Sequence, residues 1–135
     1  MHLALVTLLV SDYDAGISFF VDGLGWRLLT DEDQGHKRWV TVAPPARNPS
    51  SDQHLFQAQI LLAVATSETQ REALGQQTGD RVGFFLHTDD FARDAARITD
   101  AGGSFIEEPR VEPYGTVAQW RDPWGNLWDL IQPAP

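Results

Sequence analysis

Apolar and polar positions repeat in the same order twice along the chain. The first copy begins with an apolar strand over residues 5–10, which an Asp-rich turn and an amphipathic helix over about 15–24 follow. The second copy begins with a strand over 82–87, and another Asp-rich turn leads into a helix over about 91–101. A glycine follows each predicted helix. The order strand, turn, helix, glycine therefore occurs in both halves of the chain.

Both copies continue into three further strands. The predicted strands cover residues 26–30, 38–42 and 57–65 in the first half, and 104–107, 115–120 and 127–131 in the second. Matching Asp12 to Asp89 gives an offset of about 77 residues between the copies. We therefore predict two βαβββ modules, one over about 1–66 and one over about 80–133, in a single domain spanning residues 1–135.

Composition narrows the classes of function. A hydrophobic content of 42% over 135 residues can build a core. The chain has no cysteine, which excludes disulfides, thiolate metal sites and a cysteine nucleophile. A net charge of -9 argues against nucleic acid as a partner. With no signal-like or membrane-spanning apolar segment, we expect a cytoplasmic protein that does not bind membranes.

Three local motifs carry a resemblance to a known family. They are Gly23-Leu24-Gly25-Trp26 after the first helix, Ala101-Gly102-Gly103 after the second, and the turn Asp122-Pro123-Trp124-Gly125-Asn126 before the last strand. With the two βαβββ modules, they resemble the vicinal oxygen chelate superfamily of glyoxalase I, extradiol dioxygenases, fosfomycin-resistance enzymes and bleomycin-binding resistance proteins. The resemblance implies an α+β fold in which two modules form a curved mixed sheet cup with helices packed outside, and it implies a homodimer.

The resemblance also implies positions for a divalent metal, and this chain departs from them. The first-strand position of each module falls on Leu5 and Gly83, and the fourth-strand position falls on or near Gln59. Asp129 replaces the usual Glu at the last position. Since one carboxylate does not make a transition-metal site, we expect the usual metal site to be lost and no cofactor to be needed.

His87 and Asp129 are the remaining metal candidates. Strand alternation puts Gly83, Phe85 and His87 on one face, which the resemblance turns toward the cup. A non-standard site would require His87 to converge with Asp129 and Glu112. The alternative is that His87 ends its strand and bonds to the adjacent Asp-rich turn.

Glu112 and Tyr114 lie in a loop before a strand that is expected to line the cup. A Tyr hydroxyl beside a carboxylate could orient a polar ligand or act as an acid and base pair, which makes Asp129, Tyr114 and Glu112 the catalytic candidates. The alternative is a proline-bounded turn with a partly buried Tyr. Arg110 could bind a ligand carboxylate or pair with a neighbouring acid such as Glu107.

Aromatic residues complete the candidate ligand site. The chain has five tryptophans, and Trp39 and Trp120 lie in predicted strands, whereas alternation makes Trp128 structural. The candidate ligand-binding residues are Leu5, Thr7, Trp39, Gln59, Phe85, His87, Tyr114, Trp120 and Asp129.

Three hypotheses of function follow. The first is a protein that binds a small organic molecule, aromatic or cationic, in a cup without a metal. The second is a lyase or dioxygenase of the same superfamily with a non-standard metal set, or with none. The third is a dimeric scaffold without a ligand.

Overall fold

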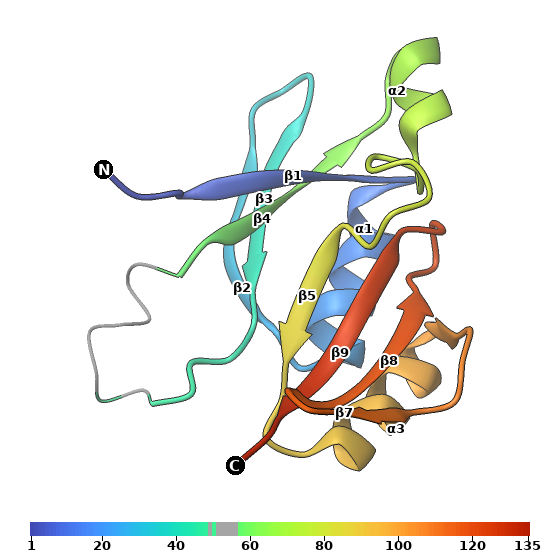
Figure 1. Ribbon diagram of the computed structural model, residues 1–135. Coiled ribbons are helices and arrows are strands. Elements are labelled where there is room, and N and C mark those ends of the chain that lie inside the picture. The colour runs from blue at the N-terminus through green and yellow to red at the C-terminus, as the bar shows by residue number, and fades with distance from the viewer. Residues whose placement is uncertain (49, 51–56) are drawn as a thin grey trace. The chain divides into compact units, whose positions relative to one another are not determined.

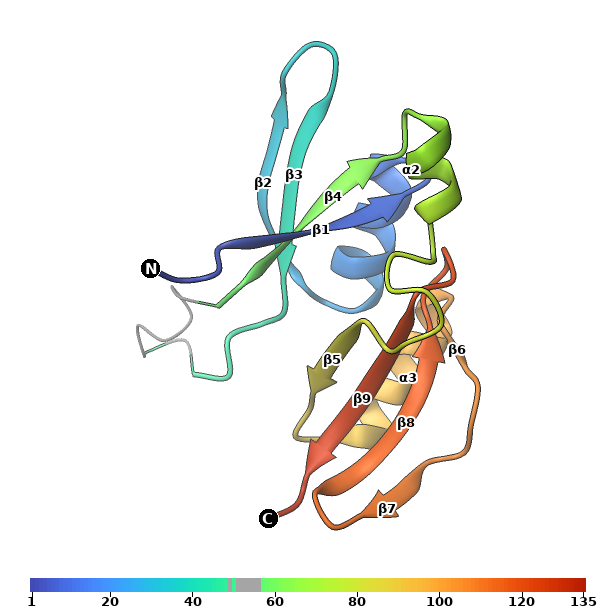
Figure 2. The same ribbon diagram turned by 45° about the horizontal axis from the view of Figure 1, so that its top comes forward.

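The computed structural model describes residues 1–48, 50 and 57–135. The chain forms two compact units, Met1–Thr66 and Ser67–Pro135. Each unit contains one mixed sheet with a helix packed on one face (Figures 1 and 2). This α+β arrangement is the one that the sequence predicts. In the described part of the chain, no helix combines the length and the apolar character needed to cross a membrane.

The first unit has a sheet of four strands in the order β1-β4-β3-β2. Its strands are β1 (Leu5–Val10), β2 (Arg27–Asp33), β3 (Arg38–Ala43) and β4 (Gln59–Val64). Strands β1 and β4 are parallel, and the other neighbours are antiparallel. The buried side chains on the helix-covered face include Leu8, Val10, Val40, Val42 and Leu62.

The first helix differs from the continuous helix predicted over 15–24. It consists of α1 (Tyr13–Ile17) and a π-helical turn, η1 (Ser18–Gly23). The backbone N–H of Leu24 bonds to the carbonyl of Phe19 at 3.0 Å, which is the wide i to i−5 spacing of a π turn. Phe19 and Phe20 are both buried there, with ring centroids 4.9 Å apart. Core packing of two adjacent aromatic rings therefore accompanies the wider turn.

The second unit has a sheet in the order β5-β9-β8-β6, and β7 also pairs with β8. The helices are α2 (Glu68–Ala73) and α3 (Phe91–Ala101), and the strands are β5 (Phe84–His87), β6 (Ser104–Phe105), β7 (Arg110–Glu112), β8 (Gly115–Arg121) and β9 (Leu127–Pro133). Strand β7 was expected to be loop. It forms because Glu112 pairs with Gly115 across a tight turn and Arg110 then pairs with Val117.

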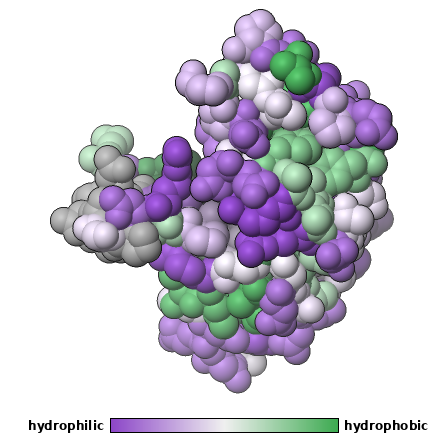
Figure 3. Space-filling model, turned by 90° about the horizontal axis from the view of Figure 1, so that it is seen from below, coloured by the Kyte–Doolittle hydropathy of each residue, from purple (hydrophilic) through white to green (hydrophobic). Residues whose placement is uncertain are grey.

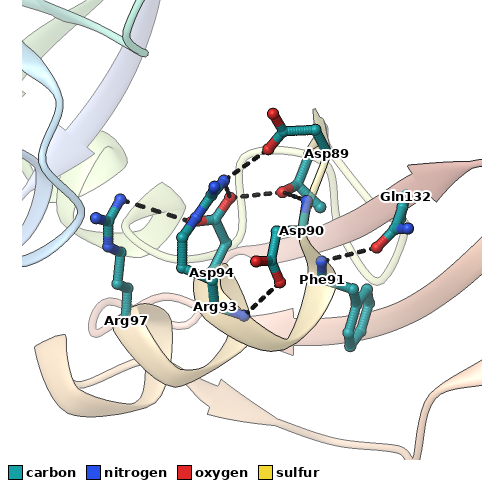
Figure 4. Close-up of polar contacts among 8 residues, drawn as sticks. Asp89, Asp90, Phe91, Arg93, Asp94, Arg97 and Gln132 are labelled. Atoms are coloured by element: carbon teal, nitrogen blue, oxygen red, sulfur yellow. Dashed lines mark hydrogen bonds and ion pairs between the residues drawn. The ribbon is translucent and has the colours of Figure 1, made fainter.

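A polar network fixes the start of α3 (Figure 4). The carboxylate of Asp90 accepts the N–H of Arg93 at 3.0 Å, and the side chain of Gln132 accepts the N–H of Phe91 at 2.8 Å. Arg93 pairs with Asp94 and Asp89, and its hydrogen bonds lower the pKa of both carboxyls. These contacts satisfy N–H groups that a helix leaves unpaired at its first turn.

The N-caps correct the alignment of the two copies. Asp12 caps α1 by accepting the N–H of Ala15 at 2.7 Å, three residues on. Asp90 makes the same contact for α3, whereas Asp89 pairs with Arg93. Asp12 therefore corresponds to Asp90, and the offset is 78 residues rather than about 77. This one-residue difference matters because it decides which side chains share a face of the sheet.

The turn before β9 is built around Asp122. Its Oδ1 accepts the N–H groups of Trp124, Gly125 and Asn126 at 3.0–3.1 Å. Its Oδ2 accepts the side-chain amide of Asn126 at 2.8 Å and the indole N–H of Trp128 at 3.0 Å. Gly125 has φ 109°, a conformation that glycine adopts without strain. The predicted turn is confirmed, and it sets the register between β8 and β9.

Candidate ligand-binding site

The faces of the second sheet follow from the stacking of its tryptophans. Trp120 and Trp128 stack with centroids 5.1 Å apart, and Phe84 stacks on Trp128 at 4.4 Å. A side chain added at Gly103, just after α3, would meet the ring of Trp120 at 3.1 Å. Trp120 and Trp128 therefore face α3. Because side chains alternate along a strand, Gln119 and Asp129 lie on the other face, which we call the open face.

Three residues form a row across the open face. Asp129 in β9 pairs in register with Phe85 in β5 on one side and with Gln119 in β8 on the other. These strands lie next to one another in Figure 1. We call Phe85, Asp129 and Gln119 the Asp129 row. It places an aromatic ring, a carboxyl group and an amide side by side.

One oxygen of the Asp129 carboxyl group has no hydrogen-bond partner among the described residues. The residue is only 8% exposed, and its Oδ1 is buried without a hydrogen bond to any residue that the structure describes. Burial raises its pKa, with a lowering influence from Arg110 and a raising one from Glu107. Phe85, its neighbour in the row, is 65% exposed. A buried acceptor thus lies beside an exposed aromatic ring.

Arg110 joins the polar residues around the row. Its guanidinium contacts Glu112 at 2.9 Å and Glu107 at 3.3 Å. Hydrogen bonds to Glu112 and Tyr114 raise the pKa of Arg110. Glu107 also accepts the backbone N–H of Gln119 at 2.8 Å. The ion-pair alternative for Arg110 is therefore confirmed, and Glu112 and Tyr114 are brought together through this arginine.

His87 lies on the same open face but not in the row. It pairs in register with Ile131, two residues beyond Asp129, and its side chain is exposed. Thr88, not His87, makes the bonds to the Asp-rich turn: its hydroxyl accepts the N–H of Asp90 at 2.9 Å and donates to Asp94 at 2.5 Å. The expected contact between His87 and that turn is absent from the contacts of the described residues.

The metal alternative does not fit these residues. The convergence of His87, Asp129 and Glu112 is not found, since the described residues contain no group of three His, Asp or Glu side chains that could hold a metal. Glu112 contacts Arg110 instead. Leu5 and Gly83 have no side-chain lone pair, and Gln59 is a neutral, poor ligand. The donor set is therefore wrong for the usual divalent metal.

The first sheet has an open face with different chemistry. A side chain added at Gly16 in α1 would meet Val10 and Leu62, so these residues face the helix. By alternation, the candidates Leu5, Thr7, Trp39 and Gln59 lie on the opposite face. With the offset of 78 residues, Thr7 corresponds to Phe85.

The corresponding row in the first unit consists of Thr7, Leu61 and Thr41. Leu61 occupies the position of Asp129, and Thr41 occupies the position of Gln119. The hydroxyls of Thr41 and Thr30 are hydrogen-bonded at 2.5 Å, so the buried polar group of this row has a partner. The first row is thus satisfied, whereas the second is not.

The structure corrects one candidate and adds another. Trp120 was expected to contact a ligand, but it is fully buried on the α3 face because it pairs in register with Trp128 and stacks on it. Gln119 was missed. The hairpin turn pairs Arg121 with Leu127 and hence Gln119 with Asp129, so the turn motif carried the signal that could have identified it.

Apolar side chains also reach the surface of the second unit. Phe85, Ile106, Val111 and Tyr114 are all about half exposed or more. Figure 3 shows hydrophobic residues (green) in patches between hydrophilic ones (purple) on one face of the molecule. An exposed ring beside a polar group is typical of a site for a small molecule.

Comparison with known proteins gives consistent matches over nearly the whole chain. Residues 2–130 match the family model "Glyoxalase/Bleomycin resistance protein/Dioxygenase superfamily". An uncharacterized protein of Shewanella frigidimarina is 44% identical over 134 residues, which are 98% of this chain and 91% of that protein.

Two solved structures are similar over nearly their full length. UcmS2 has a TM-score of 0.76 and 27% identity, with 97% of each chain covered. TnmS3, described as an antibiotic binding protein from Streptomyces sp. CB03234, has a TM-score of 0.71 and 30% identity, with 99% of this chain and 97% of TnmS3 covered.

Proposed function

We propose that this chain, which belongs to the glyoxalase/bleomycin resistance protein/dioxygenase superfamily, binds a small aromatic molecule at the open face of its second sheet. The observation that carries the proposal is the Asp129 row. Phe85 offers an exposed ring, Asp129 a buried acceptor without a partner, and Gln119 an amide. Apolar surface with a few convergent polar groups is the usual composition of a ligand site.

The likeness to TnmS3 supports the same class of function. TnmS3 is described as binding an antibiotic, and the two chains align over nearly their full length at 30% identity. One fold hosts many activities, so the likeness guides the choice of ligands and does not name one. Bleomycin and flat aromatic antibiotics are therefore the first compounds to test.

Binding without a metal suits the donor set better than Lewis-acid chemistry. A catalytic metal needs three protein ligands and an open position. Leu5, Gly83 and Gln59 cannot supply them, and the described residues contain no group of three His, Asp or Glu side chains that could hold a metal. The proposed site is therefore one of recognition through ring stacking and hydrogen bonds.

The test is a ligand panel read by thermal unfolding and by tryptophan fluorescence. We expect at least one aromatic compound to raise the melting temperature of the protein as it saturates the site. The affinity of the same compound should be lower for the Phe85→Ala and Asp129→Leu variants. The control is Leu61→Val, a change at the matching position of the first sheet, and it should leave the affinity unchanged. A panel in which no compound alters melting or fluorescence would contradict the proposal and favour the scaffold hypothesis.

A second candidate function is acid and base catalysis without a metal. The raised pKa of Asp129 favours it, because a carboxyl group whose pKa lies above its ordinary value gives up its proton less readily and is better matched to proton transfer. Tyr114 and Glu112 would be the further groups. If turnover of a ligand is found, Asp129→Ala and Tyr114→Phe should lower it, and unchanged turnover in both variants would exclude this function.

Assembly into a homodimer is a further part of the proposal, because the superfamily resemblance implies it. Sedimentation velocity at several protein concentrations measures it directly. A species with the mass of one chain, 15.0 kDa, at all concentrations would contradict it.

A further inference from the structure

We propose that Asp129 accepts a hydrogen bond from the ligand, so that the site selects aromatic molecules carrying an N–H or O–H donor beside the ring. This inference rests on the proposed function and specifies the class of ligand. It follows from the partners that Asp129 lacks and from those that its neighbours have.

One buried oxygen of Asp129 has no hydrogen-bond partner among the described residues. Polar atoms buried in folded proteins nearly always have a hydrogen-bond partner, because leaving one unpaired is costly. Oδ1 of Asp129 is an exception among the described residues. It lies on the open face of a central strand, next to an exposed ring and not within the core beneath α3. A donor on a ligand that stacks on that ring would supply the missing bond.

Donors around Asp129 that could have bonded to its carboxyl group are held by two glutamates. Arg110 is the cation that acts on this carboxyl group, but its guanidinium is held by Glu112 at 2.9 Å and by Glu107 at 3.3 Å. Glu107 also takes the backbone N–H of Gln119, the register partner of Asp129. Glu107 and Glu112 thus bind donors that lie around Asp129. Asp129 can therefore accept a hydrogen bond from a donor on a ligand.

The spacing of the Asp129 row determines where the ligand must carry its donor. Side chains on neighbouring strands are about 5 Å apart, so a ring stacked on Phe85 has its edge near Asp129. The donor must therefore be on the ring or one atom away from it. Gln119, on the other side of Asp129, adds an amide that can bond to a further polar group.

A neutral hydroxyl and a protonated amine both satisfy this description. The net charge of -9 attracts a cation from a distance, whereas a hydroxyl relies on the hydrogen bond alone. The experiment therefore uses three probes that share the naphthalene ring system: naphthol, naphthylmethylamine and methylnaphthalene. The last one has no donor and measures stacking by itself.

Dissociation constants are measured by NMR titration for the wild-type chain, Asp129→Leu and Asp129→Asn. We expect wild type to bind at least one donor probe about tenfold or more tightly than methylnaphthalene, as a bond to a charged group implies. Asp129→Leu should remove this preference while methylnaphthalene binds as before. Asp129→Asn keeps an acceptor but no charge, so it should retain a preference for naphthol and lose one for the amine.

Paired variants test the role of the glutamates. The double change Glu107→Gln and Glu112→Gln releases Arg110, which then competes for Asp129, so the donor preference should fall several-fold. The double change Glu72→Gln and Glu108→Gln is the matched control, because both side chains are exposed and the same two charges are removed. Circular dichroism and the melting temperature verify that each variant is folded.

The outcomes separate the inference from the function on which it rests. Binding of all three probes with equal affinity in wild type and Asp129→Leu would overturn the inference and leave the proposed function standing. No binding of any probe to the folded wild-type chain would overturn both.

Discussion

Two buried aspartates seven positions apart differ completely in their surroundings. Asp122 is 4% exposed and accepts hydrogen bonds from five donors in and next to its turn. Asp129 is 8% exposed and has no hydrogen-bond partner for its buried Oδ1 among the described residues. The same residue type, in the same hairpin and at similar burial, has both oxygens paired in one case and a buried oxygen without a partner among the described residues in the other.

The difference separates a carboxylate that stabilises the fold from one that we propose to be available for binding. Burying a charge is costly unless hydrogen bonds replace the lost water. Asp122 meets this condition and holds the turn together. Asp129 does not, so its presence weakens the second unit unless a ligand supplies a donor. At the equivalent position of the first unit, the sheet carries an apolar residue, Leu61, which has no side-chain polar group to pair.

The largest effect is expected from Asp122→Ala. The change removes the carboxylate that accepts hydrogen bonds from the side chains of Asn126 and Trp128 and from three backbone N–H groups. This loss should lower the free energy of unfolding by about 3 kcal/mol or more. Urea denaturation measures this loss. A loss below about 1 kcal/mol would mean that Asp122 does not differ from Asp129 in its contribution to stability.

Asp129→Leu should act in the opposite direction on stability. Replacing an unpaired buried carboxyl group by the residue type of the first unit should raise the free energy of unfolding by about 1–2 kcal/mol. Ligand affinity should fall at the same time. A variant that loses stability as Asp122→Ala does would show that Asp129 has a structural role, and it would remove the basis of the comparison.

The pH dependence of stability tests the burial of the Asp129 carboxyl group. Because burial raises the pKa of Asp129 above its ordinary value of 3.8, the folded state holds this proton more tightly than the unfolded state. The contribution of Asp129 to stability therefore falls as the pH rises from 3.8 through the pKa of the folded state. The free energy of unfolding is measured for wild type and for Asp129→Asn over a series of pH values. As the pH rises, the variant should become increasingly stable relative to wild type, and the difference should then level off. A difference that is constant with pH would contradict the raised pKa.

Phe85→Ala should have the smallest effect on stability and a clear effect on binding. Since the ring is 65% exposed, its removal should change the free energy of unfolding by no more than about 0.5 kcal/mol. Affinity for an aromatic ligand should fall several-fold, because ring stacking is lost. Val111→Ala, at a position that is 86% exposed, is the control and should change neither quantity.

Much of the fold could be predicted from local patterns. The alternation of β3, the helical spacing of α3 and the turn at Asp122 agree with the structure to within a few residues. Predictions failed where longer-range packing decided the outcome. The first helix widens into η1 where Phe19 and Phe20 both enter the core, and β7 forms only because the hairpin at Gly115 brings it against β8.

The candidate site was predicted less completely, and the reason is physical. From the sequence alone, alternation put Phe85 and His87 on one face of their strand, the family resemblance pointed to Asp129, and caps and turns determined where the strands begin and end. Only the tertiary structure decided that Trp120 packs beneath α3, that Gln119 joins the row, and that Glu107 and Glu112 hold Arg110 and leave Asp129 unpaired. A hydrogen-bond partner depends on distances between side chains of different strands, and these distances exist only once the sheet has formed.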